Sequence, residues 1–353
     1  MNCIQIEDYK RIHALPFIDW ERLTGKSILI TGSTGLIGSN LVNALIYINS
    51  VEKLGLKLIL LVRNIEAAKK KFGEKSQSIQ YRLYRLGERM DVEERIDYIV
   101  HMASPTSSKF FTEKPADTMT ANIEGTRAML ELAREKKTEK FVYLSTMEVY
   151  GFPTAGHTVK ENELGAFETM NARNSYPIGK IACEALCNSY WIQHHVPAVV
   201  LRATQTFGPG VGYDDGRVFA QFMRCVVEKK DIILKSAGLT ERPYLYTGDA
   251  VSAIIVGLLD GVSGEAYTVA NPDTYCSIKD MAQMVADKIA SGKIKVTFDI
   301  TSNLSKLGYA DTLYMNLNID KIKKLGWYPF VSLQEMFERM IKMAEKDNCV
   351  ETE

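Results

Sequence analysis

Residues Ser27 to Gly38 read Ser-Ile-Leu-Ile-Thr-Gly-Ser-Thr-Gly-Leu-Ile-Gly, an apolar run followed by three glycines spaced three apart. The run predicts a buried strand, and the apolar pattern after it predicts a helix. Gly32 permits the tight turn, Gly35 lets a pyrophosphate approach the backbone, and Gly38 lets the helix pack on the strand. The N-terminus of that helix offers unpaired N–H groups to phosphate. The stretch therefore predicts a dinucleotide site.

A second motif, Tyr176-Pro-Ile-Gly-Lys180, places a tyrosine and a lysine four residues apart. On a helix these two side chains face the same way. An ammonium group nearby favours the phenolate, so we expect Tyr176 to act as a general acid or base. The motif gains weight from residues 138–151, which predict a buried strand that ends in the hydroxyl pair Ser145-Thr146.

Together these motifs resemble the extended short-chain dehydrogenase/reductases, in particular the NAD-dependent epimerase/dehydratase family that modifies nucleotide sugars. The resemblance runs from Ser27 to about Ile341, and it is carried by the glycine motif, Val100–Ser104, Asn122–Thr126, Ser145–Gly151, Tyr176–Lys180, Leu201–Pro209, Arg217–Phe219, Arg242–Asp249 and Leu325–Pro329. It implies an enzyme of the α/β class, with a Rossmann-type doubly wound parallel sheet and a smaller C-terminal substrate domain.

Composition agrees with a large globular enzyme. The 353 residues are enough for a sizeable core. Lys and Arg equal Asp and Glu at 43 each, so no net charge favours nucleic acid or an anionic membrane. No apolar run approaches the roughly 20 residues of a membrane span. The early charges and the six scattered cysteines predict a cytoplasmic protein without a metal site.

The order of expected elements predicts the domain organisation. Strands are expected at 27–31, 56–62, 97–102, 139–145 and 197–202, with helices near 37–48, 115–136 and 174–195. This alternation is typical of a parallel sheet with helices on both faces. We assign residues 1–25 to a helical extension and 26–203, with a returning segment 244–262, to the dinucleotide domain. Residues 204–243 and 263–345 form the expected substrate domain, and 346–353 a tail.

The choice of cofactor depends on the end of the second strand. Many relatives place an acidic residue there to bind the ribose hydroxyls of NAD, whereas this chain has Arg63-Asn64. A guanidinium suits the 2′-phosphate of NADP, so NADP is favoured over NAD without excluding it. The expected cofactor residues are those of the glycine loop, the next strand end and two helices: Gly32, Ser33, Thr34, Gly35, Leu36, Ile37, Gly38, Arg63, Ala103, Ser104, Asn122 and Lys180.

The resemblance assigns roles to the catalytic residues. Tyr176 is the expected base that takes a sugar hydroxyl proton as hydride leaves the same carbon. Lys180 is expected to hold the nicotinamide ribose and to keep Tyr176 acidic, and Thr146 to hydrogen-bond the reacting oxygen. Asn122 matches a family asparagine that orders local backbone or water.

Residues 147 and 148 bear on the reaction subclass. The sugar-nucleotide 4,6-dehydratases that this chain resembles have Asp-Glu after the threonine, and UDP-glucuronate decarboxylases have Ser-Glu. This chain has Met147-Glu148. Methionine transfers no proton, so simple dehydration lacks its usual acid. Glu148 keeps the catalytic glutamate of both patterns, so elimination and decarboxylation both stay possible.

Three residues are expected to bind substrate. Arg217 and Arg242 match two family arginines that bind a nucleotide pyrophosphate, a task that suits guanidinium. Gln205 stands where relatives often have asparagine, which keeps the amide and lengthens its reach. These residues predict a nucleotide-diphosphate sugar as the substrate.

Three functions remain open from the sequence. The first is a nucleotide-sugar enzyme with transient oxidation at C4, most simply an epimerase. The second is net chemistry on the same scaffold: decarboxylation, 4,6-dehydration or reduction by NADPH. The third is a dinucleotide-binding regulator without activity, which the joint presence of Thr146, Tyr176 and Lys180 disfavours. The helices near 115–136 and 174–195 carry apolar residues on more than one face, so a second side of each must be buried. The family resemblance implies that they are buried in a homodimer, with Met129 expected at an outward position.

Overall fold

A parallel sheet forms the centre of the larger part of the molecule. The computed structural model describes residues 2–73, 78–86, 88, 92–106, 108–300 and 312–350. In this part of the chain the seven-stranded sheet has the order β11-β7-β5-β4-β1-β2-β3. Its strands are β1 (Ser27–Thr31), β2 (Lys57–Val62), β3 (Ile79–Leu83), β4 (Tyr98–His101), β5 (Lys140–Thr146), β7 (Ala198–Ala203) and β11 (Ala266–Val269). The five strands expected from the sequence are confirmed within two residues at each end.

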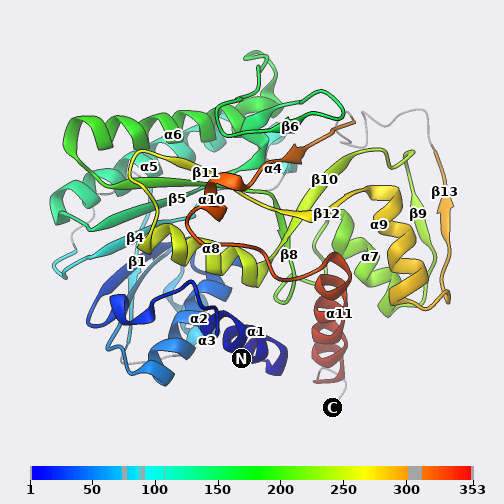
Figure 1. The fold of residues 1–353 in the computed structure, drawn as a ribbon, viewed down its shortest axis with the longest axis horizontal. Helices are drawn as coiled ribbons and strands as arrows, with labels where there is room; N and C mark the ends of the chain where they lie inside the picture. Colours follow the sequence, from blue (N-terminus) through cyan, green and yellow to red (C-terminus); the bar gives the residue numbers. More distant parts are fainter. Residues whose placement is uncertain are drawn as a thin grey trace.

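Helices cover both faces of this sheet (Figure 1). One face packs against α1 (Cys3–His13), α2 (Leu36–Glu52) and α8 (Thr247–Leu259), and the other against α5 (Pro115–Lys136) and α6 (Ser175–His194). Shorter helices in this part are η1 (Trp20–Leu23), α3 (Ile65–Phe72), α4 (Ser108–Glu113), η2 (Met147–Tyr150) and η3 (Ala172–Asn174). Apolar cores on both faces confirm the predicted Rossmann-type α/β class.

A smaller lobe lies beside the carboxyl ends of the large sheet (Figure 1). Phe207, Phe219, Phe222 and Phe337 are fully buried in its separate core. Its strands are β8 (Gln205–Phe207), β9 (Ile232–Leu234), β10 (Glu241–Tyr246), β12 (Asn271–Ser277) and β13 (Val296–Phe298), and β6 (Thr158–Val159) pairs with β14 (Asn316–Leu317). Its helices are α7 (Val218–Val227), α9 (Ile278–Met284), η4 (Val285–Ile289) and α11 (Leu333–Val350), and α10 (Asp320–Lys323) lies against β11.

Three of the predicted boundaries differ from the structure. Residues 266–269, predicted in the substrate domain, form β11 at the edge of the large sheet, paired with β7. Strand β10, predicted to return to the large sheet, instead pairs with β8 and β12, and only α8 returns. Helix α11 continues to Val350 through most of the predicted tail, while 351–353 lie outside the described residues. Short strands carry too little pattern to show which sheet they join.

Met129 is not at an outward position. Its side chain is fully buried between α5, α6 and the sheet, with Leu130 and Cys183 in the same core. The second apolar side of α5 is therefore covered within the chain, and substitution of Met129 reports on folding and not on assembly.

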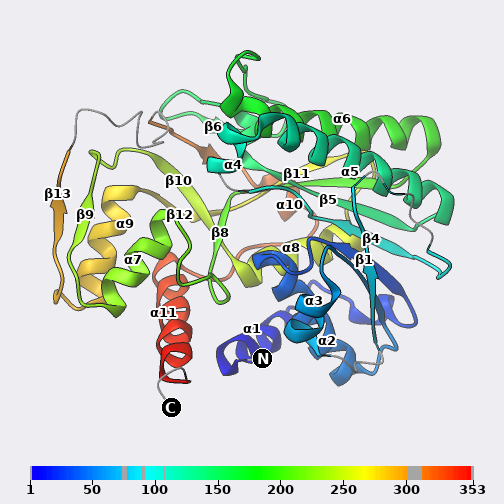
Figure 2. The same cartoon turned by 180° about the vertical axis from the view of Figure 1, so that it is seen from behind.

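The two ends of the described chain meet in a buried polar cluster, and both views show α1 beside α11 (Figure 2). The Tyr246 hydroxyl donates to Asp8 Oδ2 at 2.6 Å, and Arg339 lies 2.8 Å from Asp8 Oδ1. The Arg339 Nε atom also donates to the Tyr246 oxygen at 2.9 Å. This cluster ties the N-terminal extension to the small lobe.

Asp249, near the start of α8, is a second buried carboxyl, and it accepts a hydrogen bond from the Phe330 amide at 3.1 Å. Burial raises its pKa to about 8 from 3.8. A raised pKa gives stability that is complete below the unfolded-state pKa and is lost as pH rises to the folded-state pKa. We therefore expect Asp249→Asn to gain thermal stability relative to the unmodified protein as pH rises from about 4 to about 8, and this gain to level off at higher pH.

Thermal unfolding across this pH range tests the expectation. Asp320→Asn, which changes an exposed carboxylate, is the matched control and should show no such trend. Parallel pH curves for Asp249→Asn and the unmodified protein would show that Asp249 is ionised throughout.

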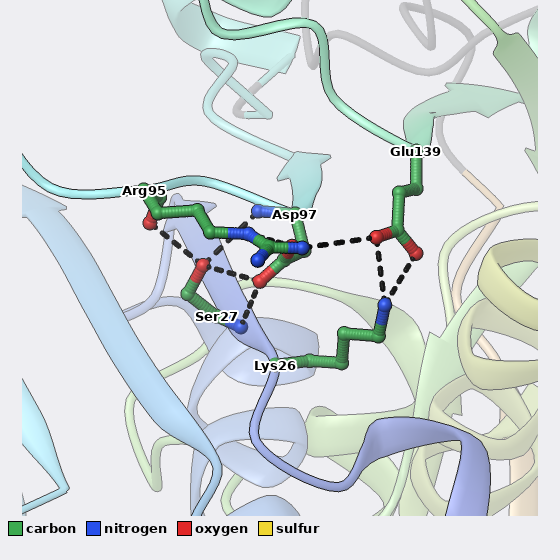
Figure 3. A network of polar contacts seen from close by, with 5 residues as sticks. All are labelled: Lys26, Ser27, Arg95, Asp97 and Glu139. Carbon is green, nitrogen blue, oxygen red and sulfur yellow. Dashed lines mark hydrogen bonds and ion pairs between the residues drawn. The ribbon is translucent and has the colours of Figure 1, made fainter.

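A polar network joins the amino ends of β1, β4 and β5 (Figure 3). Asp97 Oδ2 accepts from the Ser27 amide at 2.8 Å, and Asp97 Oδ1 accepts from Arg95 at 2.6 Å. Lys26 reaches both oxygens of Glu139 at 2.7 and 2.8 Å. Burial opposes ionisation of Asp97, but the hydrogen bonds from Ser27 and Arg95 outweigh it and hold its pKa below the usual range. The network holds together the amino ends of these strands, at the end of the sheet opposite the predicted site.

Candidate active site

The glycine loop connects β1 to α2 with the geometry that the sequence predicts. Gly32 has a φ of +68°, and a Cβ atom there would lie 2.9 Å from the Ala103 amide nitrogen. A Cβ atom on Gly38 would lie 2.1 Å from the Gly32 carbonyl oxygen. Gly35 is the N-cap of α2 and provides no side-chain cap, so the first amides of the helix stay available to an anion. The buried Ser33 hydroxyl has no partner among the described residues.

The end of β4 forms the neighbouring wall of this loop. The Thr31 hydroxyl oxygen accepts from the amides of Met102 and Ala103, each at 3.1 Å. His101 Nδ1 lies 2.7 Å from that hydroxyl, and burial together with Lys180 lowers the pKa of His101 to about 3. The His101 imidazole is therefore neutral where it contacts Thr31, next to the glycine loop. His101 was not among the residues predicted for the site.

Ser104 and Asn122, both expected in the cofactor site, are in direct contact. The Ser104 hydroxyl donates to Asn122 Oδ1 at 2.7 Å, and Asn122 Nδ2 donates to the Thr118 carbonyl at 3.0 Å. The buried Asn122 thus connects α5 to the loop after β4.

Arg63 lies at the carboxyl end of β2 and is exposed, with no hydrogen bond or ion pair among the described residues. Lys71, on the following helix α3, donates to the Thr34 carbonyl of the glycine loop at 2.9 Å. Lys71 therefore contacts the loop, and Arg63 follows the strand that pairs with β1. Lys71 was missed because nothing in its local sequence shows that α3 returns to the loop.

Thr146, Tyr176 and Lys180 meet at the carboxyl end of β5. The Thr146 side chain hydrogen-bonds that of Tyr176, which lies on the first turn of α6. Lys180 Nζ lies 5.9 Å from the centre of the Tyr176 ring and donates to the Leu144 carbonyl at 2.8 Å. Sheet and helix therefore bring together three side chains that are separated by up to 34 positions in the sequence.

The charge balance at Tyr176 differs from the one expected. Burial, and after it the charge of Glu148, raise the pKa of Tyr176 above its usual value, while the Thr146 hydrogen bond and Arg173 lower it. Burial lowers the pKa of Lys180 to about 8. The expected lowering of the tyrosine pKa by Lys180 is absent here, because the ammonium group bonds Leu144 and lies over the ring instead of beside the hydroxyl.

Two residues beside Tyr176 were not predicted. Phe111 of α4 stacks on the Tyr176 ring, with centroids 4.2 Å apart and planes 4° from parallel. The Arg173 guanidinium lies over the Phe111 ring, 5.2 Å from its centroid, and donates to Glu148 Oε2 at 2.9 Å. Arg173 stands three residues before Tyr176, about one helical turn, which is the only signal that the sequence offered.

Met147 is buried in the core, where its sulfur lies 3.0 Å from the Thr204 hydroxyl. Glu148, the next residue, is partly exposed beside Tyr176. The sequence position that carries an acid in the dehydratase pattern is therefore filled by an apolar side chain.

The expected substrate residues lie in the small lobe, and two of them are close neighbours. Gln205 lies opposite Tyr244 in the pairing of β8 with β10, and Arg242 precedes Tyr244 by two residues. Gln205 Oε1 and Arg242 Nε are buried without partners among the described residues. Arg217 lies apart, as the N-cap of α7, and forms an ion pair with Asp215 at 2.6 Å.

The chain belongs to the family described as the NAD dependent epimerase/dehydratase family, whose sequence pattern matches residues 28–270. It is therefore an enzyme of this family. None of the helices in the described part of the chain combines the length and apolar character that crossing a membrane requires.

Three similar proteins show the range of reactions in this family. UDP-glucuronic acid decarboxylase 6 of Arabidopsis thaliana is 28% identical over 309 residues, covering 87% of this chain and 85% of the relative. Human dTDP-D-glucose 4,6-dehydratase is 25% identical and covers 90% and 89%. The UDP-glucuronic acid 4-epimerase of Bacillus cereus, solved with UDP-glucuronic acid and NAD, has a TM-score of 0.72 at 22% identity, covering 91% and 99%.

Proposed function

We propose that this enzyme oxidises the C4 hydroxyl of a nucleotide-diphosphate sugar transiently and returns the hydride, with epimerisation as the simplest net result. The observation that carries the proposal is the contact of Thr146 with Tyr176, one helical turn from Lys180, at the same carboxyl end of the sheet as the glycine loop. The glycine loop, with its free helix amides and the unpartnered Ser33 hydroxyl, fits a dinucleotide pyrophosphate.

In this mechanism Tyr176, as the phenolate, takes the proton of the sugar hydroxyl, and Thr146 donates a hydrogen bond to the same oxygen. The bound nicotinamide supplies the acceptor for the C4 hydride. Arg173 provides the positive charge that offsets the buried phenolate, and Lys180 would hold the nicotinamide ribose. Tyr176 then returns its proton to the oxygen when the C4 centre is reduced again.

The small lobe is proposed to hold the nucleotide diphosphate. Gln205 and Arg242 present buried polar atoms that have no partner among the described residues, as expected for groups that bind a ligand. Arg217 would share its guanidinium between Asp215 and a phosphate, which five N–H donors permit.

Decarboxylation of a nucleotide hexuronate is the second candidate. Retention of Glu148 beside Tyr176 and the similarity to UDP-glucuronic acid decarboxylases favour it over 4,6-dehydration, because Met147 provides no acid. A screen by chromatography coupled to mass spectrometry, applied to nucleotide sugars incubated with NAD, NADP and their reduced forms, distinguishes the reactions. An epimer, which differs from the substrate in retention time but not in mass, or loss of CO2 supports these two candidate reactions; loss of water or a gain of two hydrogens would contradict them.

The cofactor is proposed to be NADP rather than NAD, because Arg63 and Lys71 flank the place where the adenosine ribose is expected. Arg63→Ala should weaken NADP(H) binding by about 1–3 kcal/mol and leave NAD(H) nearly unchanged, since only NADP carries the phosphate. Calorimetry on both cofactors measures this. An equal effect on the two would return the assignment to NAD.

The assembly is proposed to be a homodimer in the cytoplasm, with nucleic acid and membrane excluded as partners. Ile192, on the last turn of α6, is 67% exposed and gives that helix an apolar residue for a second subunit. Light scattering at micromolar concentration tests the dimer, and a monomer would contradict it.

A further inference from the structure

The Arg173 guanidinium is held in a fixed position at the edge of the proposed reaction centre. The Asn171 side chain accepts from the Arg173 amide at 3.0 Å, which anchors the backbone of η3. Phe111 contacts both the Arg173 guanidinium and the Tyr176 ring. Arg173 therefore cannot move far from this site without losing its contact with Phe111.

Arg173 and Glu148 form an ion pair that a ligand is able to reach. Their nitrogen and oxygen atoms lie 2.9 Å apart, and both side chains are 33% exposed. Apart from this bond, the guanidinium has no hydrogen-bond partner among the described residues. Several of its N–H donors are therefore available to an acceptor on the substrate.

The ion pair also sets which substituent this site tolerates. Glu148 alone would repel an anionic group on the sugar, and it raises the pKa of Tyr176. Arg173 offsets that charge and lowers the same pKa. A planar guanidinium with open donors is suited to a carboxylate, whereas a neutral hydroxymethyl group makes little use of it.

The position of the pair identifies the substituent. Thr146 and Tyr176 are proposed to hold the oxygen on C4, and Glu148 follows Thr146 by two residues. The ring carbons next to C4 are C3, which bears a hydroxyl group, and C5, which bears C6. Only C6 is able to carry a carboxylate.

We propose that Arg173 is a specificity-determining residue that binds the C6 carboxylate of a nucleotide hexuronate. This inference rests on the proposed oxidation at C4. The inference applies to an epimerase and to a decarboxylase, because both reactions begin with the same bound nucleotide hexuronate.

The experiment compares two substrate pairs that differ only in the oxidation state of C6: UDP-glucuronate with UDP-glucose, and dTDP-glucuronate with dTDP-glucose. Kinetic constants are measured with NAD and NADP for the unmodified enzyme, Arg173→Gln and Arg173→Lys. Arg134→Gln is the control, because Arg134 is an exposed arginine in an ion pair with Glu131 on α5. We expect the unmodified enzyme to favour the acid, and Arg173→Gln to lower the acid-to-neutral ratio of kcat/KM by about 10-fold or more, mainly through KM.

The control should keep the ratio, and Arg173→Lys should keep part of it. An equal loss on acid and neutral sugars in Arg173→Gln would overturn the inference and leave Arg173 as a support for Glu148. A preference of the unmodified enzyme for neutral sugars would overturn it as well, while the proposed C4 chemistry stands. Failure to convert any sugar or to reduce the cofactor would instead overturn the proposed function and this inference with it.

Discussion

Replacing Tyr176 with phenylalanine should lower kcat by roughly 100-fold or more while the protein stays folded, because it removes the group that transfers the proton. The phenylalanine ring still stacks on Phe111, which makes the substitution a test of the hydroxyl alone. Thr146→Val should cost less, since it removes one hydrogen bond to the reacting oxygen. Steady-state rates on the substrate found by the screen measure both effects.

Tyr190→Phe is the matched control for this experiment. Tyr190 lies on the same helix and donates to Glu131 Oε1 at 2.5 Å, away from the site. Its loss should leave kcat close to that of the unmodified enzyme. Turnover near the original rate in Tyr176→Phe would refute the proposed mechanism.

Replacing Arg202 with methionine should destabilise the protein by about 3–5 kcal/mol, because it leaves the buried Glu184 carboxylate without a cation. Arg202 Nη2 lies 2.7 Å from Glu184 Oε2, and the two side chains are only 6% and 9% exposed. Glu184 also accepts from Ser145, the residue before Thr146. The pair therefore joins α6 to the strand end that carries the site.

Denaturant unfolding measures this loss, and two further variants interpret it. Lys321→Met removes the partner of Glu265 in an exposed pair and should cost about 1 kcal/mol or less. The double change of Arg202→Met with Glu184→Gln should recover part of the stability, because no buried charge is then left alone. If Arg202→Met costs no more than Lys321→Met, the buried pair contributes little to stability.

The glycine loop and its flanking elements could be predicted from the sequence, because their structure is determined by residues that are close together in the chain. The glycine loop and the strand before it depend on neighbouring residues, and Gly32 and Gly38 have the close backbone contacts that the motif requires. The expected contact between Thr146 and Tyr176 needed only a strand end and a helix start in a known type of sheet.

Contacts between distant elements could not be predicted in the same way. Phe111 and Arg173 meet because α4 lies against η3, the short helix just before α6, a packing that neither segment encodes by its own pattern. Glu184 and Arg202 pair through the docking of α6 on the sheet. Met129 was placed outward because an apolar helix face predicts burial without showing what buries it.

The most direct test of the proposed C4 oxidation is a single-turnover measurement with a nucleotide sugar deuterated at C4. Excess enzyme loaded with NAD or NADP is mixed with the deuterated and the unlabelled sugar, and the near-ultraviolet absorbance of the reduced nicotinamide is followed. We predict that this absorbance rises transiently and that deuterium at C4 slows the rise. Two results would contradict the proposed C4 oxidation. One is product that forms without any reduced cofactor. The other is a rate of product formation that C4 deuteration does not change under conditions in which hydride transfer limits turnover.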